Sequence, residues 1–176
     1  MAKEHAAALQ GMALCRALSA AQLEAIAAIV QTREIAAGKE LFHEGDPGDG
    51  LFLVVSGEID IVKRGPRGER PLARLGAGAV LGEISLLTNE SRSATGRAVS
   101  DLRMLHLPAS AFRALLAADS LAALKMVAAI AEVLGHRVAT MNAKVLELAD
   151  KLDPGQQDKK DKDLAELHRA MQIWSF

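Results

Sequence analysis

The chain has 176 residues, of which 50% are hydrophobic, and this length suits one hydrophobic core with short appendages. Its formal net charge of −1 excludes the broad positive field that non-specific binding to nucleic acid requires. The single cysteine, Cys15, has no partner for an internal disulfide, and its apolar, helical neighbourhood predicts a small buried side chain in a reducing compartment.

Residues 1–31 are predicted to form helices. Ser19 and Gln22 have the pattern of a capping box that opens a second helix. Residues 1–10 lack the basic start and long apolar stretch of a signal peptide, and charged residues interrupt the apolar stretch 120–138. We therefore expect a cytoplasmic protein without a membrane span. The apolar residues at helical spacing are Leu14, Leu18, Leu23, Ile26 and Val30.

Between residues 32 and 110, short apolar runs alternate with glycines, which is typical of short strands and tight turns. Residues 51–55 and 58–62 are predicted strands, and the second alternates polar and apolar side chains as a half-buried strand does. The pattern predicts an α+β fold with an antiparallel, jelly-roll-like β-roll, flanked by the N-terminal helices and a long C-terminal helix.

Helical periodicity returns over residues 111–152, as a short segment at 111–118 and a long one at 120–152. The long segment carries an apolar seam with heptad spacing. The seam can pack on the chain's own β-roll, which we expect near Val127, or on a second copy of the helix, which we expect further along. The prediction is a parallel homodimer through residues 127–152. The seam residues are Val127, Ala131, Leu134, Val138, Met141, Val145, Leu148 and Leu152.

The chain beyond the long helix is predicted to be a linker, residues 153–163, and an amphipathic tail, residues 164–176. Pro154 and Gly155 stop the helix, and the charged run that follows has no apolar residue. The tail places Leu164, Leu167, Met171 and Trp174 on one helical face. It can dock on the body of the protein, bind a partner protein, or fray as a chain end.

Residues 81–95 form the segment with the most chemical information: a glycine-led turn, one short helix, and an arginine that enters a strand. Such a turn can direct backbone N–H groups at an anion. Arg92 adds a planar cation that can pair with two phosphate oxygens, and Ser93 adds a hydroxyl. Glu83, neutralised by Arg92, could accept a hydrogen bond from a ribose hydroxyl. The alternative is a structural salt bridge that closes a surface turn.

Segment 81–95 resembles the phosphate-binding cassette of the cyclic-nucleotide-binding domain family. Segments 41–52 and 55–59 resemble the early strands and turns of the same family, and the resemblance extends over roughly residues 18–152. It implies that Gly82 and Glu83 bind the ribose of a cyclic nucleotide. It also implies that Arg92 and Ser93 bind the cyclic phosphate.

The resemblance implies further contacts around the same ligand. The backbone amides of Ile84 and Ser85 would serve the sugar and phosphate, and Ala94 completes the cassette. The base would lie in an apolar slot between the β-roll and the long helix. Residues that would line this slot or contact the base are Val80, Leu81, Thr140 and Asn142.

Ser93 also bears on the choice of base. Relatives that favour guanine often carry threonine at this position, so the regulatory ligand that we expect is cyclic AMP, with cyclic GMP as the alternative. No cofactor is expected.

Catalysis and metal binding are disfavoured. The five histidines are scattered without metal-ligand spacing, and the chain has no nucleophile elbow or lysine-bearing phosphate loop. Asp46 and Asp49 share a glycine-rich turn, which could suggest calcium, but they fit turn chemistry better. We therefore expect no enzyme and no metal site.

Two functions remain. The first is a cyclic-nucleotide sensor that relays ligand binding through the long helix and the tail to a partner. The second is a non-binding dimeric scaffold that acts through the tail. After residue 152 there is no space for the helix-turn-helix domain of catabolite-activator-type regulators, so direct DNA binding is not expected.

Overall fold

The computed structural model describes residues 2–65 and 68–151. It comprises two units, residues 1–131 and residues 132–176. The predicted linker at 153–163 and tail at 164–176 lie outside the described residues, so the roles predicted for them stay predictions.

The N-terminal region is helical, as predicted. It comprises α1 (Ala2–Gln10), a short 3-10 helix η1 (Ala13–Cys15) and α2 (Ala20–Ala27). The capping box is present, because Ser19 Oγ accepts a hydrogen bond from the Gln22 N–H while Gln22 Oε1 accepts one from the Ser19 N–H. Cys15 is buried, and burial raises the pKa of its thiol to about 11. This thiol is therefore protonated and unreactive at neutral pH.

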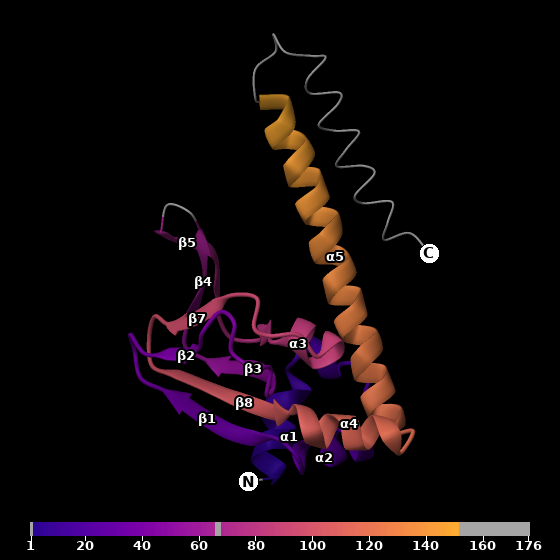
Figure 1. Cartoon of the computed structure of the whole chain (residues 1–176). Helices are drawn as coiled ribbons and strands as arrows, with labels where there is room; N and C mark the ends of the chain where they lie inside the picture. The colour runs from indigo at the N-terminus through magenta and orange to yellow at the C-terminus, as the bar shows by residue number, and fades with distance from the viewer. Residues whose placement is uncertain (1, 66–67, 152–176) are drawn as a thin grey trace. The chain divides into compact units, whose positions relative to one another are not determined.

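Two antiparallel sheets form the β-roll (Figure 1). One has the strand order β1-β8-β3-β6 and the other β2-β7-β4-β5. The β4–β5 hairpin pairs Gly65 with Gly68, as the turn residues predicted. The strands are β1 (Gln31–Ile35), β2 (Glu40–Phe42), β3 (Gly50–Ser56), β4 (Ile59–Gly65), β5 (Gly68–Leu75), β6 (Val80–Leu81), β7 (Thr95–Ala98) and β8 (Leu102–Pro108).

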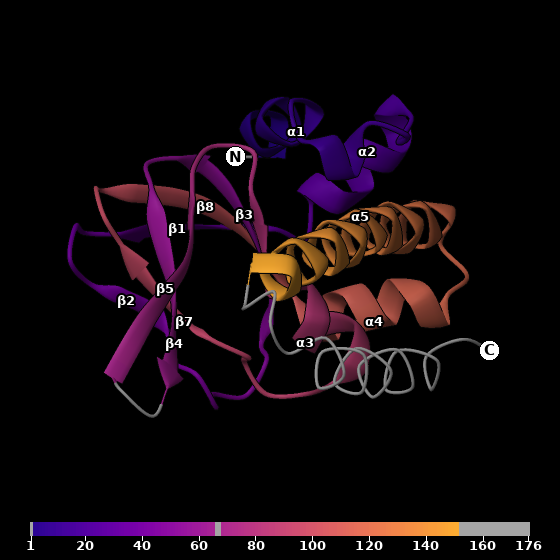
Figure 2. The same cartoon turned by 90° about the horizontal axis from the view of Figure 1, so that it is seen from above.

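The core lies between the sheets and also between one sheet and the helices. Strand β3 is buried on both faces, so its apolar residues are continuous rather than alternating. Even-numbered residues such as Phe52 and Val54 join the cluster between the sheets. Odd-numbered Leu51 and Leu53 are fully buried on the opposite face, and α4 (Ala109–Ala117) packs against β3 and β8. Figure 2 shows α1, α2 and α4 on one side of the strands.

The final helix, α5 (Leu121–Lys151), begins in the first unit and continues into the second. Ala122, Ala123, Met126 and Ile130 are buried in the first unit. Lys125 Nζ donates to Ala17 O at 2.9 Å and thereby ties the helix start to the N-terminal region.

The second unit contains the later part of the predicted seam, from Leu134 onward. Val138, Met141 and Val145 are 56%, 65% and 39% exposed, so within the described chain this part of the seam has no cover. Leu148 and Leu152 lie outside the described side chains. Among the described residues no single helix is long and apolar enough to cross a membrane; α4 and α5 pass that test only as a pair, bent by 117°.

Candidate functional site

The segment between β6 and β7 folds as the glycine-led turn and short helix that its sequence predicts. Gly82 caps α3 (Glu83–Thr88) in the left-handed conformation, with φ of 82°. A Cβ atom on Gly82 would lie 2.0 Å from Nη1 of Arg92 and 2.7 Å from the carbonyl oxygen of Gly50. Glycine is therefore required here both for its backbone angles and for the close approach of Arg92.

The Arg92 guanidinium is the buried cation of this site, and the whole residue is only 4% exposed. Its Nη1 donates to Ser85 Oγ at 3.0 Å. Its Nη2 donates to the carbonyl of Gly50 at 2.9 Å and to Asp49 Oδ1 at 2.5 Å. Its Nε has no hydrogen-bond partner among the described residues. A buried cation with an unused donor is suited to bind an oxyanion.

The guanidinium lies over two aromatic rings. Its Cζ lies 4.7 Å from the ring centroid of Phe42 and 5.3 Å from that of Phe52. Both distances are within the range of cation–π attraction. Arg92 is therefore fixed before any ligand arrives, which lowers the entropic cost of binding.

The turn between β2 and β3 fixes the backbone of Arg92. The Arg92 N–H donates to the carbonyl of Asp46 at 2.8 Å, and the Gly45 N–H donates to the carbonyl of Arg92 at 2.9 Å. The Asp46 carboxylate accepts from the His43 N–H at 2.8 Å, and this hydrogen bond is the main reason that its pKa lies below the ordinary value. The Asp46 carboxylate thus stabilises the turn between β2 and β3, as its sequence context predicted.

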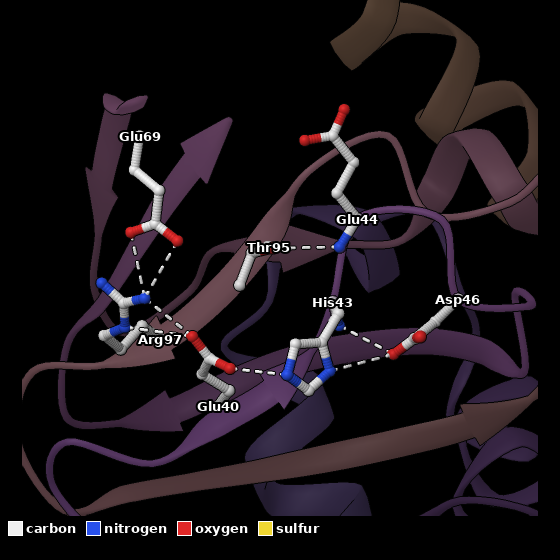
Figure 3. Close-up of polar contacts among 7 residues, drawn as sticks. All are labelled: Glu40, His43, Glu44, Asp46, Glu69, Thr95 and Arg97. Atoms are coloured by element: carbon white, nitrogen blue, oxygen red, sulfur yellow. Dashed lines mark hydrogen bonds and ion pairs between the residues drawn. The ribbon is translucent and has the colours of Figure 1, made fainter. Parts of the chain in front are cut away.

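A polar cluster anchors this turn to the second sheet (Figure 3). Arg97 of β7 donates to Glu40 of β2 at 2.7 Å and to Glu69 of β5 at 3.1 Å. The imidazole of His43 lies 2.6 Å from Glu40, and the Glu44 N–H donates to Thr95 Oγ1 at 2.9 Å. The hydrogen bond from Arg97 is the largest cause of the lowered pKa of Glu40. The cluster therefore links three strands to the turn that holds Arg92.

Asp49 is the residue of the site that the sequence interpretation missed. Its sequence context predicts turn chemistry, yet its carboxylate pairs with Arg92, 43 residues away in the chain. Its side chain is 62% exposed, whereas the side chain of Arg92 is 2% exposed. The carboxylate binds Nη2 of the guanidinium, whereas the donor without a partner is Nε.

Of the cassette residues predicted from the sequence, Gly82 and Ser85 lie against the Arg92 side chain, and the others differ in exposure. Glu83 and Ser85 are buried, at 6% and 3%, and Ala94 is buried at 7%. Ile84 is 38% exposed, and Ser93 is also exposed. Leu81 is buried on β6 beside the partly buried Val80.

Thr140 and Asn142 lie on α5 within the second unit. The hydroxyl of Thr140 donates to the carbonyl of His136, one turn earlier in the helix. Their predicted contacts with a base stay predictions. Within residues 2–65 and 68–151, no group of three or more histidine, cysteine, aspartate or glutamate side chains could hold a metal ion.

The sequence of this chain is similar to sequences of known proteins. Residues 32–119 match the family model described as the cyclic nucleotide-binding domain. The cyclic AMP receptor protein of Thermus thermophilus is 34% identical over 143 residues, which cover 81% of this chain and 61% of that protein. A cyclic nucleotide-gated potassium channel of Mesorhizobium japonicum is 33% identical over 102 residues, which cover 58% of this chain and 27% of the channel.

Solved structures agree with the fold. The crystal structure of a cyclic nucleotide-binding domain from Methylobacillus flagellatus superposes with a TM-score of 0.72 at 26% identity, covering 83% of each chain. This chain spans less than two thirds of the length of both curated relatives named above.

Proposed function

Because the chain belongs to the cyclic nucleotide-binding domain family, we propose that it is a sensor whose ligand is cyclic AMP, held at its phosphate by Arg92. The observation that carries the proposal is the preformed Arg92 site. The buried guanidinium has an unused Nε–H, and it pairs with the exposed carboxylate of Asp49. A cyclic phosphate carries one negative charge, and its oxygens can accept a hydrogen bond from the unused Nε–H.

Glu83 is proposed to select the ribose. It is buried at the first position of α3, next to Gly82. A buried carboxylate that accepts a hydrogen bond from the ribose 2′-hydroxyl disfavours a ligand without that hydroxyl, because the complex would then lack this hydrogen bond. Ser93 and the backbone amides of Ile84 and Ser85 complete the proposed contacts.

The preference for adenine over guanine rests on two observations. Ser93 stands where guanine-favouring relatives often carry threonine, and the relative from Thermus thermophilus is a cyclic AMP receptor protein. We propose an apolar slot for the base, lined by Val80 and Leu81, with Thr140 or Asn142 in contact with its polar edge.

The output of the sensor is proposed to be a change in α5. The exposed seam of Val138, Met141 and Val145 favours a parallel dimer of this helix. Ligand binding would favour one arrangement of the helix and of the tail at 164–176, and the tail would then engage a partner protein.

The test is calorimetric titration of nucleotide-free protein with cyclic AMP, cyclic GMP and 2′-deoxy cyclic AMP. We expect saturable binding that is strongest for cyclic AMP. The deoxy ligand should bind at least about tenfold more weakly, and Glu83→Gln should reduce that discrimination. Equal affinities for cyclic AMP and cyclic GMP would overturn the base preference. An absence of binding by folded, nucleotide-free protein would overturn the sensor function and favour the scaffold.

A further inference from the structure

His106 lies buried beside the arginine site. It belongs to β8, pairs with Phe52 of β3 in the sheet register, and is 4% exposed. Its ring stacks on that of Phe52, with 4.6 Å between the centroids and 19° between the planes. The Arg92 guanidinium carbon lies 5.3 Å from the centroid of the same Phe52 ring. The histidine and the arginine thus contact one shared aromatic ring.

The imidazole of His106 has a hydrogen-bonding capacity that its neighbours do not use. Neither ring nitrogen has a hydrogen-bond partner among the described residues. Buried polar atoms in proteins are nearly always hydrogen-bonded, because a buried donor without an acceptor costs free energy. A phenylalanine would stack on Phe52 without this cost, so packing alone does not explain a histidine at this position.

The carboxylate of Asp49 faces His106 Nε2. Its Oδ2 lies 3.6 Å from Nε2, while its Oδ1 accepts a hydrogen bond from Arg92 Nη2. A hydrogen bond between these atoms needs a separation of about 3.2 Å, so a shift of about 0.4 Å would form one. The Asp49 side chain is 62% exposed, and close packing does not oppose this shift.

The charges around His106 make it a neutral donor. Burial has the largest effect on the imidazole and lowers its pKa below the ordinary value of 6.5. The charge of Asp49 raises this pKa, whereas Arg33 of β1 and Arg92 lower it. At neutral pH the ring is therefore uncharged and carries one N–H. A neutral donor does not compete with Arg92 for the charge of Asp49.

We propose that His106 is a positioning residue of the nucleotide site, which donates its Nε2–H to Asp49 Oδ2 and thereby holds that carboxylate on Nη2 of Arg92. The inference rests on the proposed function. Asp49 stays on Nη2 when the nucleotide binds, and the cyclic phosphate takes the Nε–H that has no partner. His106 thus fixes the guanidinium in the orientation that presents this donor to the ligand.

The second contact matters because the Asp49 carboxylate is exposed. Water competes with Arg92 for an exposed carboxylate, and the attraction between the two side chains is weakened by solvent. A donor that is itself buried and stacked restricts the carboxylate to one orientation before the ligand arrives. This lowers the entropic cost of binding the ligand.

A double-mutant cycle, measured by calorimetric titration with cyclic AMP, tests this role. His106→Phe keeps the ring stack but removes the N–H, and it should weaken binding at least about fivefold. His106→Gln offers an N–H at the reach of Nε2 and should stay within about twofold of wild type. In the Asp49→Ala background, His106→Phe should change the affinity by less than about twofold, because the acceptor is absent.

NMR of the ligand-free protein tests the contact without any nucleotide. At about pH 7 the neutral His106 ring should carry its proton on Nε2. Asp49→Ala should lower the pKa of His106, because the carboxylate that raises it is removed. A proton on Nδ1, or an unchanged pKa in Asp49→Ala, would overturn the contact. This measurement also decides the case in which His106→Phe does not fold.

The outcomes separate this role from the sensor function. A wild-type protein that binds no cyclic AMP overturns the sensor function, and the NMR result still decides whether His106 contacts Asp49. Equal affinity in wild type and His106→Phe overturns the role of His106 alone. The same holds for a loss in His106→Gln as large as that in His106→Phe, or for a loss that persists in full in the Asp49→Ala background.

Discussion

The position of the Arg92 guanidinium depends on a few neighbouring residues. Gly82 approaches the guanidinium so closely that it cannot carry a side chain without displacing Arg92, and a Cβ on Gly50 would collide with the carbonyl of Leu107. The aromatic rings and the Ser85 hydroxyl then fix the orientation of the arginine. Binding strength at this site therefore depends on backbone geometry as much as on charge.

Substitution of Gly82 by alanine tests this dependence. The new Cβ would meet Arg92 Nη1, so Gly82→Ala should weaken cyclic AMP binding at least about tenfold and lower the free energy of unfolding by about 1–3 kcal/mol. Gly78→Ala is the matched control, because Gly78 has a similar φ of 86° but no atom within 4 Å of the place that a Cβ would take. Gly78→Ala should lose stability and keep its affinity for cyclic AMP. Calorimetry and urea denaturation measure both quantities, and equal affinity losses in the two variants would contradict the steric explanation.

Individual residues also show how far sequence interpretation reaches. The local pattern from Gly82 to Arg92 predicted the turn, the short helix and the arginine, because all of these are encoded within a dozen residues. The partner of Arg92 was not predictable in this way. Asp49 lies 43 residues earlier, and only the pairing of strands brings it to the guanidinium.

At the scale of elements, the helices and several strands were predictable, since capping, hydrophobic period and glycine spacing are local signals. The order of the strands was not. β1 pairs with β8 and β2 pairs with β7, and both partners lie late in the chain. The alternation of polar and apolar residues within one strand does not indicate which strand it pairs with. These non-local pairs place the β2–β3 turn against Arg92.

The polar cluster around Arg97 predicts how stability responds to acid. The pKa of Glu40 is held below its ordinary value of 4.5 mainly by Arg97, so the unfolded chain binds a proton at higher pH than the folded one. The stability that this gives is present above about pH 4.5 and is lost as the pH falls through the folded-state pKa. Urea denaturation between about pH 6 and pH 3 should therefore show stability falling with acid, and Glu40→Gln should flatten this slope. An unchanged slope in Glu40→Gln would assign the acid sensitivity to other carboxylates.

At the scale of the whole molecule, the exposed seam of α5 predicts association. Met141→Glu places a charge where a parallel partner helix would bury it, so the variant should be monomeric. Ala139→Glu introduces the same charge on an exposed position outside the seam and should leave the dimer intact. Sedimentation equilibrium measures both. A wild-type monomer, or equal association of the two variants, would contradict a dimer through this helix.

The central claim is that Arg92 binds the phosphate of a cyclic nucleotide, and calorimetric titration of the nucleotide-free protein with cyclic AMP tests it most directly. Wild type should bind saturably. Arg92→Ala should lose at least about 100-fold in affinity, since it removes a buried, charge-assisted contact. Arg97→Ala, which removes a partly exposed arginine of the neighbouring cluster, should stay within about threefold of wild type. Cyclic AMP binding that is as tight in Arg92→Ala as in wild type, or absent from wild type, would contradict the account.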